Sequence, residues 1–399
     1  MPYDAEVIIA GAGPAGSLAA YELAVRGVSV LVIEKSQFPR YKVCGAGLTH
    51  KILSEIPFDL SPVFETAVHT VRFSHRLGEV FERRSELPMI YCTMRDKLDS
   101  FLLEKAVQAG ARVIHAGKVT EIFQDEDTVT VKTKDQVYQS RLLIGADGAS
   151  GIVARSAGLR TNIMQGLAWE AEIKTDASAL QRFSETVFLD WGTFPGGYAW
   201  LFPKGDHISV GVGGPAALSK HMMPYYRRFM EYLSPEIKVT ETYSLKSWPI
   251  PVRRARERFH NGRILITGDA GGLTDPLTGE GIFYAVRSGR MAAHACVDYL
   301  RGEQKAISEF SDRINDELVN ELLEAERIKN IFNTIPGKIH RWVKESDRGW
   351  RAFGKILRGD RNYADIRRGF GRWRFLWTTA TLVSGWIYKW KERQFSNHG

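Results

Sequence analysis

The chain has 399 residues, 44% of them hydrophobic and 25% charged, which is enough apolar material for two or three domains with buried cores. Its three cysteines form no CxxC pair, which argues against a disulfide scaffold or a zinc framework. The uncharged run at residues 375–388 is shorter than the ~20 residues of a membrane-spanning helix.

The net charge of +8 is concentrated near the C-terminus. Residues 341–399 contain 14 Lys or Arg against 5 Asp or Glu, and six of the ten Trp. Basic residues interleaved with aromatic ones suit a membrane surface or an acidic partner, and a packed helical bundle is the alternative. The aromatic residues that carry this interpretation are Trp373, Trp377, Trp386, Tyr388 and Trp390.

These features predict a cytoplasmic protein in a reducing compartment. We expect it to contact the inner face of the membrane peripherally and to have no nucleic-acid partner. The first apolar run, residues 7–10, leads directly into a glycine motif, so we expect no signal peptide to be cleaved there.

The chain opens with a predicted β-turn-α-β unit. Residues 6–10 form an apolar strand, residues 15–26 a helix and residues 29–33 a second apolar strand. Consecutive strands joined through a helix are expected to be parallel. Glu34 follows the second strand, where a carboxylate accepts hydrogen bonds from ribose hydroxyls.

The turn between that strand and helix carries the glycine motif GAGPAG, residues 11–16. Gly11 permits the tight turn, Gly13 lets the backbone approach a pyrophosphate, and Gly16 lets the helix pack closely. The unpaired N–H groups at the start of the helix then face the phosphates. With Glu34 in register, the unit predicts a dinucleotide site rather than an empty glycine turn.

The remaining predicted elements alternate between strand-rich and helical stretches. They are a helix at 95–109, a strand at 112–114, an antiparallel meander at 119–123, 129–132 and 137–144, strands with one helix near 218–232 between about 160 and 256, a strand at 263–267, a helix at 279–300, and basic helices after 303.

We therefore predict an α/β fold with a Rossmann-type dinucleotide-binding domain, which the resemblance described below makes an FAD-binding domain, a sheet-rich substrate domain and a helical C-terminus. The dinucleotide-binding domain takes residues 1–159, including inserted substrate-side elements, and residues 257–302. The substrate domain takes residues 160–256, and the basic helical region residues 303–399.

Two further strand ends carry glycine and aspartate. Residues 145–148 (GADG) follow an apolar strand, and residues 268–270 (GDA) follow another and continue to 276–282 (PLTGEGI). An aspartate at such a position can accept a hydrogen bond from a ribityl hydroxyl, and the later glycines open a helix whose N–H groups can face a flavin. Taken singly, each motif is equally compatible with an ordinary turn.

In this order and spacing, the three motifs resemble the flavoprotein family that includes p-hydroxybenzoate hydroxylase, the flavin halogenases and the geranylgeranyl reductases, over residues 3–300. The resemblance implies FAD as the cofactor, with Arg95 at a flavin-contacting position and Val119 near the adenine. The expected cofactor-binding residues are Gly11, Gly13, Ala15, Gly16, Glu34, Cys44, Gly45, Gly47, Arg95, Val119, Asp269, Gly281 and Ile282.

Residues 38–48 (FPRYKVCGAGL) are similar to the Cys-Gly-Gly-Gly loop of the geranylgeranyl reductases, except that Ala46 replaces the middle glycine. Gly45 and Gly47 lack side chains, so we expect the loop to pass close to a flat ring. Cys44 is either a small buried residue or a thiol beside the flavin with a role in proton donation.

Residues 195–203 (PGGYAWLFP) are similar to the Tyr-x-Trp-x-Phe-Pro signature of the same reductases. On a strand, Tyr198, Trp200 and Phe202 share one face, which forms either an apolar wall for a polyisoprenoid chain or ordinary core packing. The resemblance implies reduction of prenyl double bonds on a lipid, quinone or chlorophyll-type pigment. The expected catalytic residues are Cys44, Tyr198 and Trp200; no metal site is expected.

A second dinucleotide motif is missing, so NAD(P)H would bind transiently or a ferredoxin-like protein would supply electrons. An FAD-dependent monooxygenase or halogenase is the enzymatic alternative, although the Trp-x-Trp-x-Ile-Pro motif of the halogenases is absent. A membrane-associated flavin protein without turnover is the alternative from another class.

Overall fold

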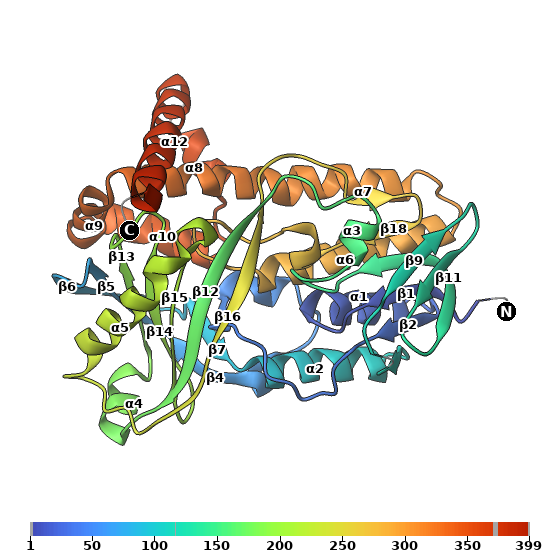
Figure 1. Ribbon diagram of the computed structural model, residues 1–399, viewed down its shortest axis with the longest axis horizontal. Coiled ribbons are helices and arrows are strands. Elements are labelled where there is room, and N and C mark those ends of the chain that lie inside the picture. Colours follow the sequence, from blue (N-terminus) through green and yellow to red (C-terminus); the bar gives the residue numbers. More distant parts are fainter. Residues whose placement is uncertain (1–2, 116, 370–373, 398–399) are drawn as a thin grey trace.

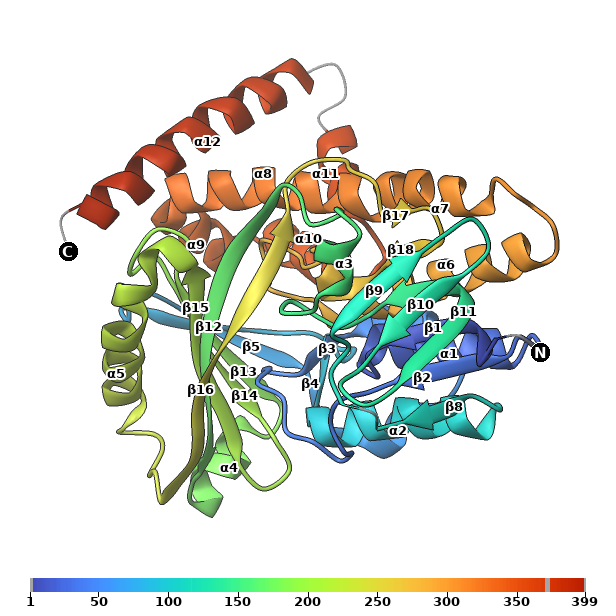
Figure 2. The same cartoon turned by 45° about the vertical axis from the view of Figure 1, so that its right-hand side comes forward.

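The computed structural model describes residues 3–115, 117–369 and 374–397, and it has the predicted α/β fold. Two large sheets lie beside each other, and the C-terminal helices cover them from one side (Figures 1 and 2). Within the described ranges, no helix is both long and apolar enough to cross a bilayer.

The eight-stranded sheet carries the predicted N-terminal unit. Its path is β17-β18-β11-β1-β2-β8, in which β18, β11, β1, β2 and β8 are parallel, and β10 and β9 extend β11 as the predicted antiparallel meander. The strands are β1 Ala5–Ala10, β2 Val30–Ile33, β8 Arg112–Ile114, β9 Glu121–Gln124, β10 Val129–Lys132, β11 Val137–Gly145, β17 His260–Asn261 and β18 Ile264–Ile266.

Helices cover this sheet, so β2 is fully buried and β1 is buried at five of its six residues, as expected for parallel strands. The helices of this part are α1 Pro14–Ala24, α2 Arg95–Gln108, α3 Val153–Ser156 and α6 Ile282–Leu300. α1 and α6 approach closely because Gly289 has no side chain; a Cβ there would lie 2.3 Å from the Ala15 carbonyl oxygen.

The seven-stranded sheet has the order β16-β12-β15-β14-β13-β5-β6, antiparallel except for the β13–β5 pair. Its strands are β5 Thr70–His75, β6 Val80–Arg84, β12 Ile163–Lys174, β13 Thr186–Trp191, β14 Tyr198–Pro203, β15 Ile208–Pro215 and β16 Glu241–Arg253. The sheet thus takes two strands from before residue 160. The domain boundaries given above stay a prediction.

The outer face of this sheet is covered by two helices, α4 Ala177–Phe183 and α5 Met222–Leu233. The second corresponds to the helix predicted near residues 218–232, but its first residues form a separate 3-10 turn, Ala216–His221. Between the two large sheets lies a three-stranded one, formed by β3 Gly47–Thr49, β4 Phe64–Val68 and β7 Ile90–Thr93.

The C-terminal quarter is helical, as predicted. It contains α7 Ala306–Ile314, a π-helical turn Asn315–Val319, α8 Asn320–Thr334, α9 Pro336–Glu345, α10 Asp347–Arg358, α11 Tyr363–Gly369 and α12 Arg374–Asn397. α9 and α10 cover the inner face of the seven-stranded sheet, where Val343 and Leu357 join one apolar cluster with Phe73 and Trp191. α12 crosses α8 on the outside of the molecule (Figure 2).

Candidate functional site

One large cavity of about 1130 Å³ lies where the two sheets and the helical layer meet. It has two limbs. One follows the carboxyl ends of β1, β2 and β18, where open parallel sheets bind ligands. The other runs between the inner face of the seven-stranded sheet and α8–α10. Except for Gly16, every residue expected at the cofactor or in catalysis lines this cavity.

The glycine motif shapes the first limb as predicted. Gly11 has φ +98°, and a Cβ there would lie 2.5 Å from the Ala146 carbonyl oxygen. Gly16 packs against the Gly11 backbone and does not line the cavity, so its missing side chain allows the tight turn rather than contact with a ligand. A Cβ on Gly13 would meet nothing within 4 Å, and no side chain caps the start of α1. This open approach to uncapped N–H groups fits a pyrophosphate.

Glu34 lies at the end of β2 and is 4% exposed. Its carboxylate accepts hydrogen bonds from the backbone N–H of Ala12 at 2.8 Å and of Ser36 at 2.9 Å. A carboxylate has about four acceptor positions, so two remain for ribose hydroxyls. Val119 lines the same limb, and its contact with the adenine stays a prediction.

The two later aspartate motifs have different roles. Asp147 accepts hydrogen bonds from the N–H groups of Ile152 and Val153, at 2.6 and 3.0 Å, and so caps α3. Asp269 has one long side-chain contact, at 3.5 Å to the Thr274 hydroxyl. Both aspartates line the cavity, and both keep acceptor capacity, Asp147 through the Oδ1 that has no partner among the described residues.

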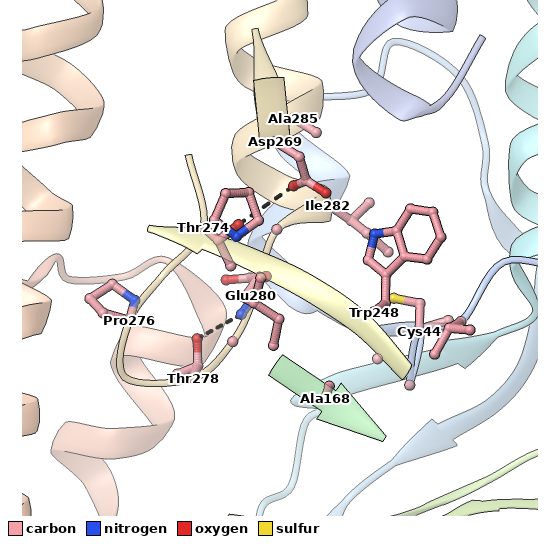
Figure 3. Close-up of a pocket in the computed structure, with 18 of the residues that line it drawn as sticks. Cys44, Ala168, Trp248, Asp269, Thr274, Pro276, Thr278, Glu280, Ile282 and Ala285 are labelled. Carbon is pink, nitrogen blue, oxygen red and sulfur yellow. Dashed lines mark hydrogen bonds between the residues drawn. The ribbon is translucent and has the colours of Figure 1, made fainter. Parts of the chain in front are cut away.

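The uncapped N-terminus of α6 reaches the cavity at Gly281 and Ile282. Figure 3 shows the preceding loop, with Thr274 and Glu280 along one side of the cavity near Asp269 and Ile282. A 19-residue helix that starts here presents free N–H groups and a positive dipole end. These groups suit the polar edge of a flavin ring.

The loop before β3 carries Cys44, Gly45 and Gly47, and the structure changes our interpretation of its glycines. A Cβ on Gly45 would lie 3.1 Å from the ring of Phe202 and 3.2 Å from Trp200 Nε1, and a Cβ on Gly47 would lie 2.8 Å from Phe202. The flat rings that these glycines accommodate thus belong to the chain itself. The Lys204 ammonium holds the loop by donating to the Gly45 carbonyl oxygen at 2.8 Å.

The aromatic row of β14 faces the cavity, as predicted from its alternation. Tyr198 and Trp200 are neighbours, with ring centroids 5.5 Å apart, and Trp200 is 5% exposed. Burial raises the pKa of the Tyr198 hydroxyl, which therefore stays protonated. The rings make one continuous apolar surface at the junction of the two limbs.

Arg95, at the start of α2, is buried and paired. Its guanidinium donates to both carboxylate oxygens of Asp99, at 2.8 and 2.7 Å, and Arg40 lies 3.0 Å from the same carboxylate. This pairing fixes the orientation of Arg95 where it lines the cavity. Its contact with the flavin stays a prediction.

The sequence analysis missed Glu170, which lines the cavity from β12 and is 1% exposed. One of its oxygens accepts the Cys44 N–H at 2.9 Å. Burial and the neighbouring Glu172 carboxylate raise the pKa of Glu170 well above its usual range. A signal was present: Glu170 and Glu172 alternate with apolar residues, which places two carboxylates on one face of a strand.

The second limb is apolar. The sheet contributes Val71, Phe73, Val187, Leu189 and Trp191, and the helices contribute Phe332, Ile339, Val343, Phe353 and Leu357. Such a lining excludes water and suits a hydrocarbon chain.

Comparison with known proteins identifies the family. Residues 4–192 match the family described as FAD binding domain. The digeranylgeranylglycerophospholipid reductase of Methanocella arvoryzae is 30% identical, over 84% of this chain and 89% of that protein. The geranylgeranyl diphosphate reductase of Rhodobacter capsulatus is also 30% identical, over 77% of this chain and 78% of that protein. The chain belongs to the geranylgeranyl reductase family.

It is accordingly an FAD-dependent oxidoreductase, and its cavity offers a fitting cradle for that cofactor. Solved structures share its fold. A geranylgeranyl bacteriochlorophyll reductase-like protein from Thermoplasma acidophilum shares the fold with a TM-score of 0.74 and 22% identity, over 92% of this chain and 99% of that one. A flavin-dependent brominase also shares the fold, with a TM-score of 0.70 and 23% identity, over 89% and 93%.

Proposed function

We propose that this enzyme saturates carbon–carbon double bonds of a long prenyl chain of geranylgeranyl type, carried by a lipid, a quinone or a chlorophyll-type pigment. The observation that carries the proposal is the second limb of the cavity. It begins at the aromatic row of β14 and continues between hydrophobic side chains. A small polar substrate would leave this apolar surface without a partner.

Reduced FAD supplies the hydride for such a reaction. The chain's own residues bind the cofactor, hold the alkene against the aromatic row and exclude water. Trp200 and Tyr198 present flat apolar faces, which orient a chain and stabilise positive charge that develops on an alkene carbon.

We infer that the electron donor binds transiently. The glycine-rich segment at residues 211–214 forms part of β15 inside the seven-stranded sheet, so it provides no second dinucleotide turn. NAD(P)H in transient contact with the bound flavin, or a ferredoxin-like protein at the basic surface, is the expected donor.

We also propose that α12 contacts a membrane surface. Four of its large apolar side chains are between 51% and 73% exposed: Leu382, Val383, Trp386 and Trp390. Its other face is buried against α8, where the Thr334 hydroxyl donates to the Ser384 carbonyl oxygen at 3.2 Å. The helix therefore combines packing with an exposed apolar face, beside the exposed cations Lys389 and Arg393.

The predicted tail aromatics contribute unequally to this picture. Trp386 and Trp390 belong to the exposed face, whereas Tyr388 is buried. Trp373 and the side chain of Trp377 lie outside the described residues. The exposed face would bring the enzyme to substrates dissolved in a bilayer.

Lipid mass spectrometry tests the proposed function in cells. Cells with the protein should contain prenyl lipids or pigments heavier by 2 Da per reduced bond than cells without it. Identical prenyl saturation in both, for every lipid class and pigment, would contradict the proposal.

A further inference from the structure

Glu170 has an unpaired oxygen inside the cavity. Oε1 accepts the Cys44 N–H at 2.9 Å, whereas Oε2 is buried and has no hydrogen-bond partner among the residues that the structure describes. A buried carboxylate oxygen without a partner is costly unless it carries a proton or meets a ligand. Since Glu170 lines the cavity, its free oxygen can carry a proton and can also meet a ligand there.

The strand register brings this carboxyl group to the aromatic row. Glu170 lies opposite Gly211 on β15, and Gly211 lies opposite Trp200 on β14. A Cβ on Gly211 would lie 2.2 Å from Cζ2 of Trp200, so the indole extends over the glycine toward β12. The Trp200 Nε1 is also buried without a partner among the described residues. The aromatic wall and the carboxyl group thus face the same part of the cavity.

The charges around Glu170 favour its neutral form. Burial and the Glu172 carboxylate raise its pKa, and together they outweigh the opposing effects of Lys204, the Cys44 N–H and Lys42. The titratable groups around Glu170 are Glu172 on its own strand, Tyr198 and Lys204 from β14 and the turn after it, Lys246 opposite it on β16, and Tyr41, Lys42 and Cys44 from the loop.

A short series of ionisable groups leads from solvent to Glu172, two residues from Glu170 on β12. His207 Nε2 lies 3.2 Å from Oε2 of Glu172, and His207 Nδ1 lies 2.6 Å from Oδ1 of Asp206. The Asp206 side chain is 91% exposed. His207 thus stands between the exposed carboxylate of Asp206 and the buried Glu172, which lies two residues from Glu170 on β12.

We propose that Glu170 is the catalytic acid that protonates the prenyl double bond, with Glu172 and His207 restoring its proton from solvent. The inference rests on the proposed function. The alkene gains a hydride from reduced FAD at one carbon, and its π electron pair forms the second C–H bond with the carboxyl proton of Glu170. Glu170 is left as a carboxylate, which the Cys44 N–H, Lys42 and Lys204 stabilise until the proton is restored.

Glu170→Gln tests the proposal, because the amide keeps an acceptor for Cys44 but has no acidic proton. Photoreduced, flavin-loaded enzyme is mixed without oxygen with a geranylgeranyl lipid, and flavin reoxidation is followed. We expect Glu170→Gln to react at least about a hundredfold more slowly, the usual contribution of a general acid, with unchanged flavin content. The matched control is Glu241→Gln, an exposed carboxylate on β16, which should keep the wild-type rate.

The pH dependence gives a second measurement. The acid must be protonated to react, so the wild-type rate should fall as the pH rises through the pKa of Glu170, while the residual Glu170→Gln rate should not show this fall. In Glu172→Gln the decline should begin at lower pH, because the charge that raises the pKa of Glu170 is gone. A Glu170→Gln enzyme with the wild-type rate and pH profile would overturn the proposal while leaving the proposed function intact.

Infrared spectroscopy supplies a readout that needs no turnover. The oxidised, flavin-loaded wild type and Glu241→Gln should both show a protonated-carboxyl C=O band at neutral pH that is missing from Glu170→Gln. If the spectra of the wild type and Glu170→Gln do not differ in this band, Glu170 is ionised, and its role as the acid is overturned. If the band is present but the wild type reduces no prenyl substrate, the proposed function fails, and the proton-donor role fails with it.

Discussion

Ala46 has an unusual backbone conformation for its residue type. Its φ of +43° lies in the left-handed region, and it stands where the loop of the geranylgeranyl reductases has glycine. An L-residue with a Cβ pays about 1–2 kcal/mol in this region. The loop is nevertheless held in place by two hydrogen bonds. The Lys204 ammonium donates to the Gly45 carbonyl oxygen, and the backbone N–H of Thr93 donates to the Ala46 carbonyl oxygen.

Ala46→Gly should therefore leave the stability of the flavin-loaded protein unchanged or raise it by up to about 1 kcal/mol, since relief of strain offsets the greater freedom of glycine when unfolded. Denaturant unfolding followed by flavin release measures this. The control is Ala109→Gly, whose φ of −77° is ordinary, so it should destabilise. An equal loss of unfolding free energy in Ala46→Gly and Ala109→Gly would show that Ala46 is not strained.

Single residues also mark the limit of prediction from sequence. The place of Glu34 at the cavity could be predicted because it follows from a local strand–turn–helix pattern. Glu170 could not be singled out, because its partner Cys44 is 126 residues away and its burial depends on the β12–β15–β14 register. Asp147 and Asp269 follow similar strands, and only the packing shows that Asp147 caps a helix.

At the scale of elements, the local hydrophobic pattern predicted helices and strands correctly where segments that are close in sequence are also close in space. The β-turn-α-β unit, the meander and the helix α6 were predicted on this basis. β5 and β6 had no predicted counterpart, because β5 gains its place by parallel pairing with β13, more than a hundred residues later. The aromatic side chains predicted to share one face of β14 line the cavity, whereas the helices that complete the apolar limb lie in a tail that was predicted only as basic and helical.

The exposed face of α12 predicts that the folded, flavin-loaded protein binds membranes through this helix. Leu382→Glu combined with Trp386→Glu should reduce sedimentation with vesicles of anionic lipid several-fold, because charges replace exposed apolar surface while the buried face stays intact. Flavin content should not change. Leu87→Glu, at a residue 59% exposed outside α12, is the matched control and should bind as the wild type does.

Vesicle binding equal to that of the wild type in the double variant would show that α12 does not carry the membrane contact. These substitutions are more informative than removal of residues 371–399, since the truncation would also uncover α8. It would break the contacts of Lys391 with the Asn333 and Thr334 carbonyl oxygens.

At the scale of the whole molecule, the two sheets and the helical layer enclose one continuous cavity. The dinucleotide limb is built by the eight-stranded sheet, the apolar limb by the seven-stranded sheet and the C-terminal helices, and the aromatic row of β14 stands where they meet. Under the proposed function, this arrangement would place the prenyl chain beside the flavin and away from water. The brominase shares this fold, so the fold alone does not distinguish its chemistry from that of this enzyme, and the distinction must come from the site.

The most direct test of this account is an oxygen-free single turnover. Photoreduced enzyme is mixed with a geranylgeranyl lipid, flavin reoxidation is recorded, and the lipid is analysed by mass spectrometry. The account predicts that the flavin is reoxidised and that the lipid gains 2 Da for each bond reduced. Reduced flavin that persists with prenyl substrates but reacts productively once oxygen is admitted would contradict it and would favour a monooxygenase or halogenase.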